Sequence, residues 1–154
     1  MRYRLEMHEQ FNTRLPAEQA FNYIVDFSKI DQWDHTISEA KKISDGDIGL
    51  GTQFDLTFSM GSRKTPISYQ ITKYEPNQSA VLTGVSDRFT AIDTVNIEQN
   101  ENGCKVSWQA EINFSGLTAL LMPLVAKKVK AVGAKTIRDL NKKLDQMAGA
   151  VSTD

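Results

Sequence analysis

Asp93 is the residue whose type and position most suggest chemistry. It shares the parity of Ala91 and Val95 in a run of alternating residues, so its carboxylate is expected on the apolar face of a strand. A carboxylate there must be paired, protonated or directed into a wet pocket, because burying an uncompensated charge is costly. Asp93 could therefore orient a polar group of a ligand or act as a general base with a raised pKa. A β-bulge near the preceding turn would instead shift the register and put Asp93 in solvent.

Three further side chains could take part in such chemistry. Arg88 could pair with an inward carboxylate, although an arginine in a loop is usually solvated. Tyr69 has the parity of its apolar neighbours and offers a phenol donor. His35 follows Trp33 at the end of a predicted short helix, where a lone imidazole is more often a surface or capping residue. None of the three forms a recognisable catalytic set with Asp93.

The sequence lacks the residue sets that metal and nucleophilic chemistry require. His8 and His35 are the two histidines, and they cannot supply the sets of His and carboxylate ligands that iron sites use. Cys104 lies at a predicted hairpin, without a basic helix terminus to activate its thiol. The sequence does not indicate a Ser-His-Asp triad, and it has no glycine-rich phosphate loop between a strand and a helix. We therefore expect no metal and no other cofactor.

Length and composition place limits on the class of protein. The 154 residues fit one domain, 1–150, followed by a tail at 151–154. A net charge of -1 gives no general attraction to phosphate polymers, so nucleic-acid binding is disfavoured. The single cysteine excludes an internal disulfide, and the first residues lack the apolar stretch of a signal peptide. These features predict a cytoplasmic protein, and no window approaches the roughly 18 apolar residues of a membrane span.

Two short helices are predicted after a first strand. The alternation of Tyr3, Leu5 and Met7 with polar residues indicates a half-buried strand. Pro16 suits the first turn of a helix that should run to about Asp26. Next, Ser28 and Asp31 have the spacing of a capping box, which predicts a second short helix reaching Trp33.

Strand patterns then dominate from 52 to 114. Residues 52–60 give the clearest period-two signal, and Asn102 with Gly103 is a strong hairpin signal between two longer strands. The second strand of this hairpin, which follows the strand containing Asp93, carries a matching set of residues on one face: Val106, Trp108, Ala110, Ile112 and Phe114. In total, the patterns predict six or seven antiparallel strands.

One long amphipathic helix is predicted at 117–147. Its apolar residues recur at helical spacing in a broad stripe, and Pro123 should either kink it or sit in the first turn of its main segment. Gly133 either weakens the helix or allows close packing on a strand. Lysines crowd the same segment and form a basic ridge, which is either a solvated helix face or a surface for weak contact with an anionic membrane.

Several short segments, in order along nearly the whole chain, carry a resemblance to a known superfamily. They are LPAEQAF at 15–21, Asp26, Trp33, GLGTQF at 49–54, YEP at 74–76 and GCKVSW at 103–108. In this order they resemble the START/SRPBCC superfamily, and most of all its polyketide cyclase/dehydrase and lipid-transport group. The signature of the ubiquinone-binding branch is absent around 21–33, so a respiratory quinone chaperone is disfavoured.

The resemblance implies an α+β helix-grip fold: a seven-stranded curved antiparallel sheet around a long C-terminal helix, with two short helices after the first strand. It also implies a cavity between sheet and helix. The residues expected to line it are Phe54, Phe58, Met60, Tyr69, Ile71, Asp93, Val95, Trp108, Ile112 and Leu124. Alternatively, these apolar side chains simply fill a solid core.

Three functions are compatible with these patterns. The favoured one is binding or transport of a small hydrophobic, lipid-like or polyketide-like molecule, because that function needs no catalytic set. A second is a cofactor-free cyclase or aromatase in which Asp93, Arg88 or Tyr69 moves protons. The third is a non-catalytic interaction protein with a filled core, using an outer surface such as the basic ridge.

Overall fold

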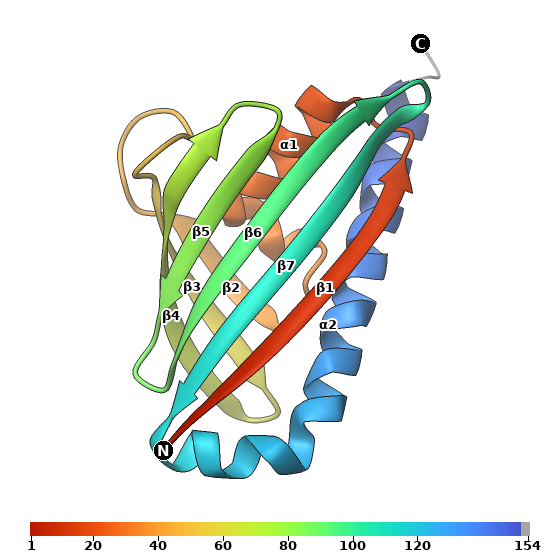
Figure 1. Ribbon diagram of the computed structural model, residues 1–154. Coiled ribbons are helices and arrows are strands. Elements are labelled where there is room, and N and C mark those ends of the chain that lie inside the picture. The colour runs from red at the N-terminus through yellow and green to blue at the C-terminus, as the bar shows by residue number, and fades with distance from the viewer. Residues whose placement is uncertain (152–154) are drawn as a thin grey trace.

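A single curved sheet is the largest element of the molecule. The computed structural model describes residues 1–151, apart from the side chains of Met60 and Val151. Seven antiparallel strands pair in the order β1-β7-β6-β5-β4-β3-β2 (Figure 1). Their bounds are β1 Arg2–Thr13, β2 Ile37–Lys42, β3 Gln53–Met60, β4 Arg63–Glu75, β5 Ser79–Val85, β6 Phe89–Asn100 and β7 Gly103–Ser115. The predicted α+β helix-grip architecture is therefore confirmed.

The register through β5, β6 and β7 places Asp93 on the inner face. Asp93 lies opposite Leu82 on β5 and Ala110 on β7, and neither pairing contains a bulge. The same face of β6 carries Ala91 and Val95, both buried, as the alternation predicts. The alternative in which a bulge turns Asp93 into solvent is wrong for this fold.

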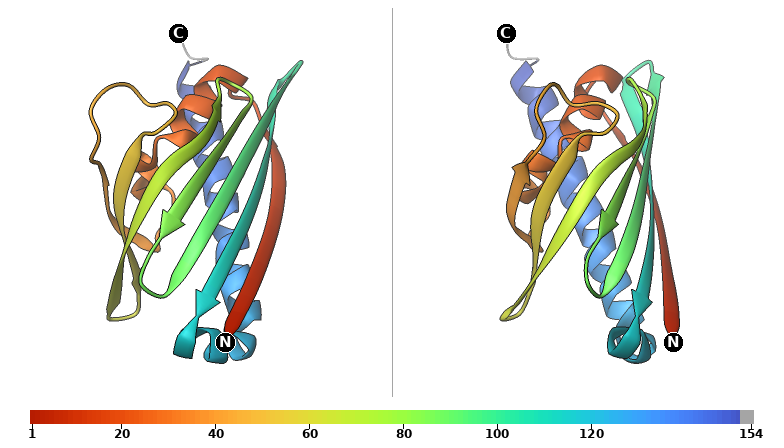
Figure 2. Two further views of the ribbon diagram at one scale, coloured as in Figure 1. Left: turned by 60° about the vertical axis from the view of Figure 1, so that its left-hand side comes forward. Right: turned by 90° about the vertical axis from the view of Figure 1, so that its left-hand side faces the viewer.

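The sheet bends around one long helix. Irregular pairing occurs between Ile37 and Glu39 on β2 and between Ile71 and Lys73 on β4. Extra residues of this kind bend a strand and increase its twist. Figure 2 shows the resulting concave face, with the helix crossing it.

Two short helices close one end of the concave face. α1 spans Ala17–Val25 and buries Phe21 and Ile24 completely. The second, η1, is a 3-10 helix at Phe27–Gln32, so it ends one residue before Trp33. Its cap is Asp26, whose carboxylate accepts from the Ser28 amide at 3.1 Å and from the Ser28 hydroxyl at 2.5 Å. The predicted capping box between Ser28 and Asp31 is wrong, because Asp26 satisfies the free amide.

The long helix, α2, spans Gly116–Val151 and bends after its first turns (Figure 1). Pro123 lies inside it and lacks the amide hydrogen that the helical ladder needs, which accounts for the bend. Farther along, a Cβ added to Gly133 would lie 2.7 Å from Met7 Sδ. Gly133 therefore serves close packing of α2 on β1. Of the predicted tail at 151–154, Val151 belongs to α2, and residues 152–154 lie outside the described residues.

The apolar interior consists of two separate clusters. The larger surrounds α1 and contains Phe21, Phe54, Leu140 and Leu144. The smaller, at the other end of the sheet, is built from Leu5, Phe114 and Ala119. Because the two clusters do not merge, space remains between them under α2.

Candidate functional site

A cavity of about 230 Å³ occupies this space between the sheet and α2. Its wall includes five of the residues predicted to line it: Phe58, Tyr69, Asp93, Trp108 and Ile112. Met7, Phe114, Val129 and Val132 contribute apolar wall from β1, β7 and α2. The wall is thus drawn from strands at both edges of the sheet as well as from the helix.

Four other predicted residues lie elsewhere. Phe54, Ile71 and Val95 are fully buried in the larger cluster, so they support the cavity without facing it. Leu124 was expected on the inner face, but its side chain is 82% exposed. That expectation is wrong. α2 bends near Pro123, and Leu124 lies on the exposed side of the turns at the bend. The side chain of Met60 lies outside the described residues.

Asp93 is held by two neutral donors. Tyr69 Oη donates to Asp93 Oδ2 over 3.1 Å, and Trp108 Nε1 donates to Asp93 Oδ1 over 3.0 Å. Each carboxylate oxygen can accept more than one hydrogen bond, so both retain capacity for a further donor. Asp93 is surrounded by protein yet keeps some accessible surface, since it lines the cavity.

Burial dominates the ionisation of this pair. Removal from water raises the pKa of Asp93 to about 6, although the bonds from Trp108 and Tyr69 act in the opposite direction. Burial, together with the neighbouring carboxylate, raises the pKa of Tyr69 well above its ordinary value, so the phenol remains a donor. At neutral pH the pair is therefore mainly a carboxylate facing a neutral phenol.

Aromatic rings fix these two donors in place. Phe27 stacks on Trp108 with ring centroids 6.4 Å apart and meets the edge of Tyr69 at 5.1 Å. Trp33 packs edge-on against Trp108 at 5.6 Å. Gly84 lies opposite Tyr69 on β5, where an added Cβ would be 2.7 Å from the ring. The absence of a side chain at Gly84 thus gives the Tyr69 ring its position.

Two acidic residues of the cavity wall were not predicted from the sequence. Asp34, in the turn after η1, accepts from the Thr36 amide at 2.9 Å and from its hydroxyl at 2.5 Å. Burial raises its pKa, and its charge in turn contributes to the raised pKa of Asp93. Glu9 on β1 also lines the cavity. Its parity with Met7 could have revealed it, whereas the Asp34 and Thr36 spacing indicates a turn but not its orientation.

The wall has a consistent charge character. Its titratable side chains are Glu9, Asp34, Tyr69 and Asp93, and among the described residues that line it there is no Lys, Arg or His. Within the same part of the chain, no group of three or more His, Cys, Asp or Glu side chains could hold a metal ion. The site is thus an apolar chamber with acidic groups.

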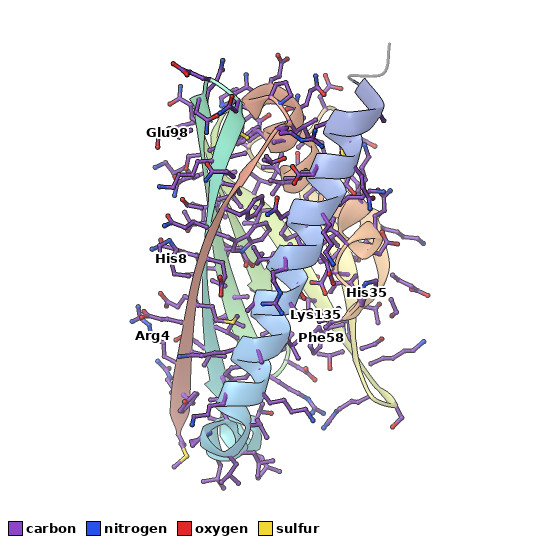
Figure 3. The ribbon with its side chains drawn as sticks, turned by 90° about the vertical axis from the view of Figure 1, so that its right-hand side faces the viewer. Arg4, His8, His35, Phe58, Glu98 and Lys135 are labelled. Carbon is purple, nitrogen blue, oxygen red and sulfur yellow. The ribbon has the colours of Figure 1, made fainter. Side chains whose placement is uncertain are left out.

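The other candidates lie outside the chamber. Arg88, in the turn before β6, is 3.9 Å from Asp87 and makes no ion pair with Asp93. His35 is exposed, with Nε2 3.7 Å from Asp139 Oδ2 on α2, and His8 points away from the helix on β1 (Figure 3). Cys104 is buried, and burial raises the pKa of its thiol to about 11. Neither Arg88, the histidines nor Cys104 contributes to the cavity wall.

A comparison with known families identifies the chain. The family model described as polyketide cyclase / dehydrase and lipid transport matches residues 4–145. The chain belongs to this family. The resemblance seen in the sequence is therefore confirmed. No curated protein matches the sequence.

Solved structures share the fold at low sequence identity. A Staphylococcus aureus protein of unknown function matches with a TM-score of 0.73 and 10% identity, covering 99% of this chain and 98% of that one. A protein from Thermus thermophilus gives a TM-score of 0.69 at 13% identity, covering 99% of both chains. Ara h 8.0201 gives 0.67 at 14% identity, over 92% of this chain and 97% of its own. These likenesses establish the fold alone.

The close approach of Gly84 to Tyr69 predicts a costly substitution in this family member. Gly84→Ala should lower the free energy of unfolding by about 1 to 3 kcal/mol, because the ring must move out of its contact with Phe27 and Asp93. Urea denaturation measures this, with Gly49→Ala as control, since a Cβ there meets nothing within 4 Å. In a Tyr69→Ala background the Gly84 cost should largely disappear, and equal costs in both backgrounds would contradict the contact.

The raised pKa of Asp93 predicts a pH-dependent stability. The folded state holds the Asp93 proton more tightly than the unfolded chain, so this stabilisation is present below about pH 4 and is lost as the pH rises through about 6. Asp93→Asn should remove the loss and raise the free energy of unfolding by about 1 to 3 kcal/mol at neutral pH, with the gain vanishing near pH 4. Urea denaturation across this range tests it, with Asp45→Asn in the exposed β2–β3 loop as control. A gain independent of pH would show that ionisation is not its cause.

Proposed function

We propose that the protein binds and carries a small hydrophobic molecule, lipid-like or polyketide-like, in the cavity between the sheet and α2. The observation that supports this is the chamber itself, which is about 230 Å³ in volume and mainly apolar. It exceeds the roughly 150 Å³ of an engineered dry cavity that binds benzene, and it falls below the roughly 300 Å³ at which drug-sized pockets begin. A ligand of one or two rings, or of a short chain, suits this volume.

The polar groups of the wall define the ligand further. Asp93 and Asp34 are acceptors when ionised, and no basic side chain among the described wall residues balances them. A ligand carboxylate would meet like charge without a counter-ion, in surroundings of low dielectric constant. A hydroxyl or an amine would instead donate to Asp93. We therefore assign the ligand a hydrogen-bond donor or a cationic group at its polar end.

The family supports the same function. Its description joins lipid transport with polyketide cyclisation and dehydration, and both concern largely apolar molecules. The third function, an interaction protein with a filled core, needs a packed interior between the sheet and α2. The cavity counts against it.

A neutral two-ring fluorescent probe such as 6-acetyl-2-(dimethylamino)naphthalene should gain signal with the native protein. It should be displaced by 2-naphthylmethylamine and 2-naphthalenemethanol, and at least tenfold less effectively by 2-naphthoate, because the last brings a carboxylate beside Asp93 and Asp34. Displacement titrations measure the order. Asp93→Asn should weaken the amine more than the alcohol.

Filling the cavity provides the control for location. Ala110 lines the cavity wall beside Asp93, as its cross-strand neighbour on β7. Ala131, in contrast, lies exposed on α2. Ala110→Phe should abolish the probe signal, and Ala131→Phe should leave it unchanged. If native protein gives no signal, and mass spectrometry of extracted protein finds no apolar molecule, carrier function is excluded. If 2-naphthoate binds as well as the amine, only the assigned polar group is wrong.

Asp93 also favours a second candidate, a cofactor-free enzyme of the cyclase or dehydrase kind. Its pKa of about 6 suits a general base near neutral pH, and it faces the cavity beside the Tyr69 donor. In such a reaction Asp93 would take a proton from the bound molecule, while Tyr69 donates its hydrogen bond to the Asp93 carboxyl group. The two candidates thus share one chamber and differ in whether a bond changes.

For any substrate turned over, Asp93→Asn should lower kcat by about 10² to 10⁴. The wild-type rate should rise with pH through about 6, as the base loses its proton. Steady-state kinetics measure both. The Asn variant is expected to be at least as stable as the wild type at neutral pH, so a lost rate cannot be ascribed to unfolding. Unchanged turnover would remove Asp93 from the mechanism.

A further inference from the structure

The first turns of α2 expose a large apolar surface, which we call the α2 entry surface. Leu124 is 82% exposed, Leu117 71% and Leu120 54%. Leu121 and Val125 are also exposed within the same turns. Isolated exposed leucines are common on proteins, but five large apolar residues within nine positions form a contiguous patch, and such patches mark interaction sites.

The opposite side of the same turns is apolar as well. Ala119 is buried in the smaller core cluster, while Met122 and Val129 line the cavity. A helical segment that is apolar on all sides is normally covered on all sides. The inner side is covered by the sheet, whereas no element within residues 1–151 covers the α2 entry surface.

Positive charge borders this surface. Lys127, Lys128 and Lys130 follow directly and are exposed, and the sequence has no Asp or Glu from 116 to 138. The chain start adds Arg2, which pairs with Ser115 just before α2. The neighbouring turn before β6 brings one exposed carboxylate, Asp87, beside Arg88. The net charge of the side chains around these leucines is therefore positive.

We propose that the α2 entry surface docks on a membrane of anionic phospholipids, with the leucines among the acyl chains and the lysines at the headgroups. An apolar helix face flanked by lysines has the character of an interfacial helix, and each basic residue near an anionic surface adds to the attraction. A second copy of this chain fits less well, because a symmetric contact through the leucines would bring the two sets of lysines together.

Docking in this orientation places one end of the cavity at the bilayer. The entry turns lie across one end of the molecule, and α1 lies at the other (Figure 1). Met122 belongs to these turns and also lines the cavity, so a hydrophobic molecule leaving past it would meet lipid. The proposal goes beyond ligand binding and does not require a ligand.

Vesicle co-sedimentation tests the proposal. The wild type should bind vesicles of phosphatidylcholine mixed with phosphatidylserine more tightly than phosphatidylcholine alone, and salt should weaken the binding. Leu117→Gln/Leu124→Gln should weaken it about tenfold or more, and so should Lys127→Gln/Lys128→Gln. These side chains are exposed, so the melting temperature should change little.

Matched controls lie far from α2. Ile43→Gln/Leu50→Gln removes two apolar side chains that are 51% and 72% exposed near the β2–β3 loop, and Lys41→Gln/Lys73→Gln removes the same charge elsewhere. Neither control should alter vesicle binding. Absent vesicle binding, or equal losses in variants and controls, overturns the proposal. So does a wild-type dimer that the leucine variant converts to monomer without loss of lipid binding. Probe binding in the cavity should be unchanged in all these variants, which separates failure here from failure of the carrier function.

Discussion

The structure depends on one geometric constraint: a single helix cannot fill the concave face of a seven-stranded sheet. α2 packs mainly on β1, where Gly133 lets the helix approach Met7. α1 and η1 fill one end of the remaining space with Phe21, Phe27 and other apolar side chains. Leu5, Phe114 and Ala119 fill the other end. What remains between the two clusters is the cavity. Protein interiors are otherwise packed at crystal-like density, so the open space under α2 distinguishes this region from the two packed clusters.

Within that void, the choice of partners for Asp93 decides its chemistry. An arginine beside it would have satisfied the carboxylate and lowered its pKa. The partners are instead Tyr69 and Trp108, which donate hydrogen bonds without supplying positive charge. The carboxylate is therefore stable enough to be ionised near neutral pH, yet its charge is not neutralised by the protein. In the proposed carrier function, a ligand with a donor or a cation would supply what the wall lacks. In the second candidate function, the same unneutralised charge would let Asp93 act as a base.

The alternation of residues along each strand predicted which side chains face the helix. It did not predict how far along the strand the cavity lies. The alternation around Asp93 gave the correct face, because side chains of a strand alternate strictly and no bulge interrupts β6. Phe54 and Phe58 share that face on β3, but only Phe58 reaches the cavity, since Phe27 covers Phe54 with ring centroids 6.0 Å apart. Contacts of this kind join residues distant in sequence. Asp34 was missed for a related reason: its turn with Thr36 is a local feature, whereas its direction depends on how η1 sits against β2.

The largest departure from the sequence pattern is the division of the apolar stripe on α2. A single straight helix would bury the whole stripe, and Leu140 and Leu144 are indeed fully buried. Pro123 bends the helix, and Ala119 and Met122 occupy the inner side of its first turns. The exposed side carries Leu117, Leu120, Leu121 and Leu124. Leaving these four leucines and Val125 exposed forfeits part of the roughly 1.5 to 3 kcal/mol that full burial of each side chain would contribute. A sequence could avoid that cost with polar residues, as the rest of the helix does with its lysines. The membrane docking that we propose would recover this burial energy among the acyl chains, beside the end of the cavity that Met122 lines.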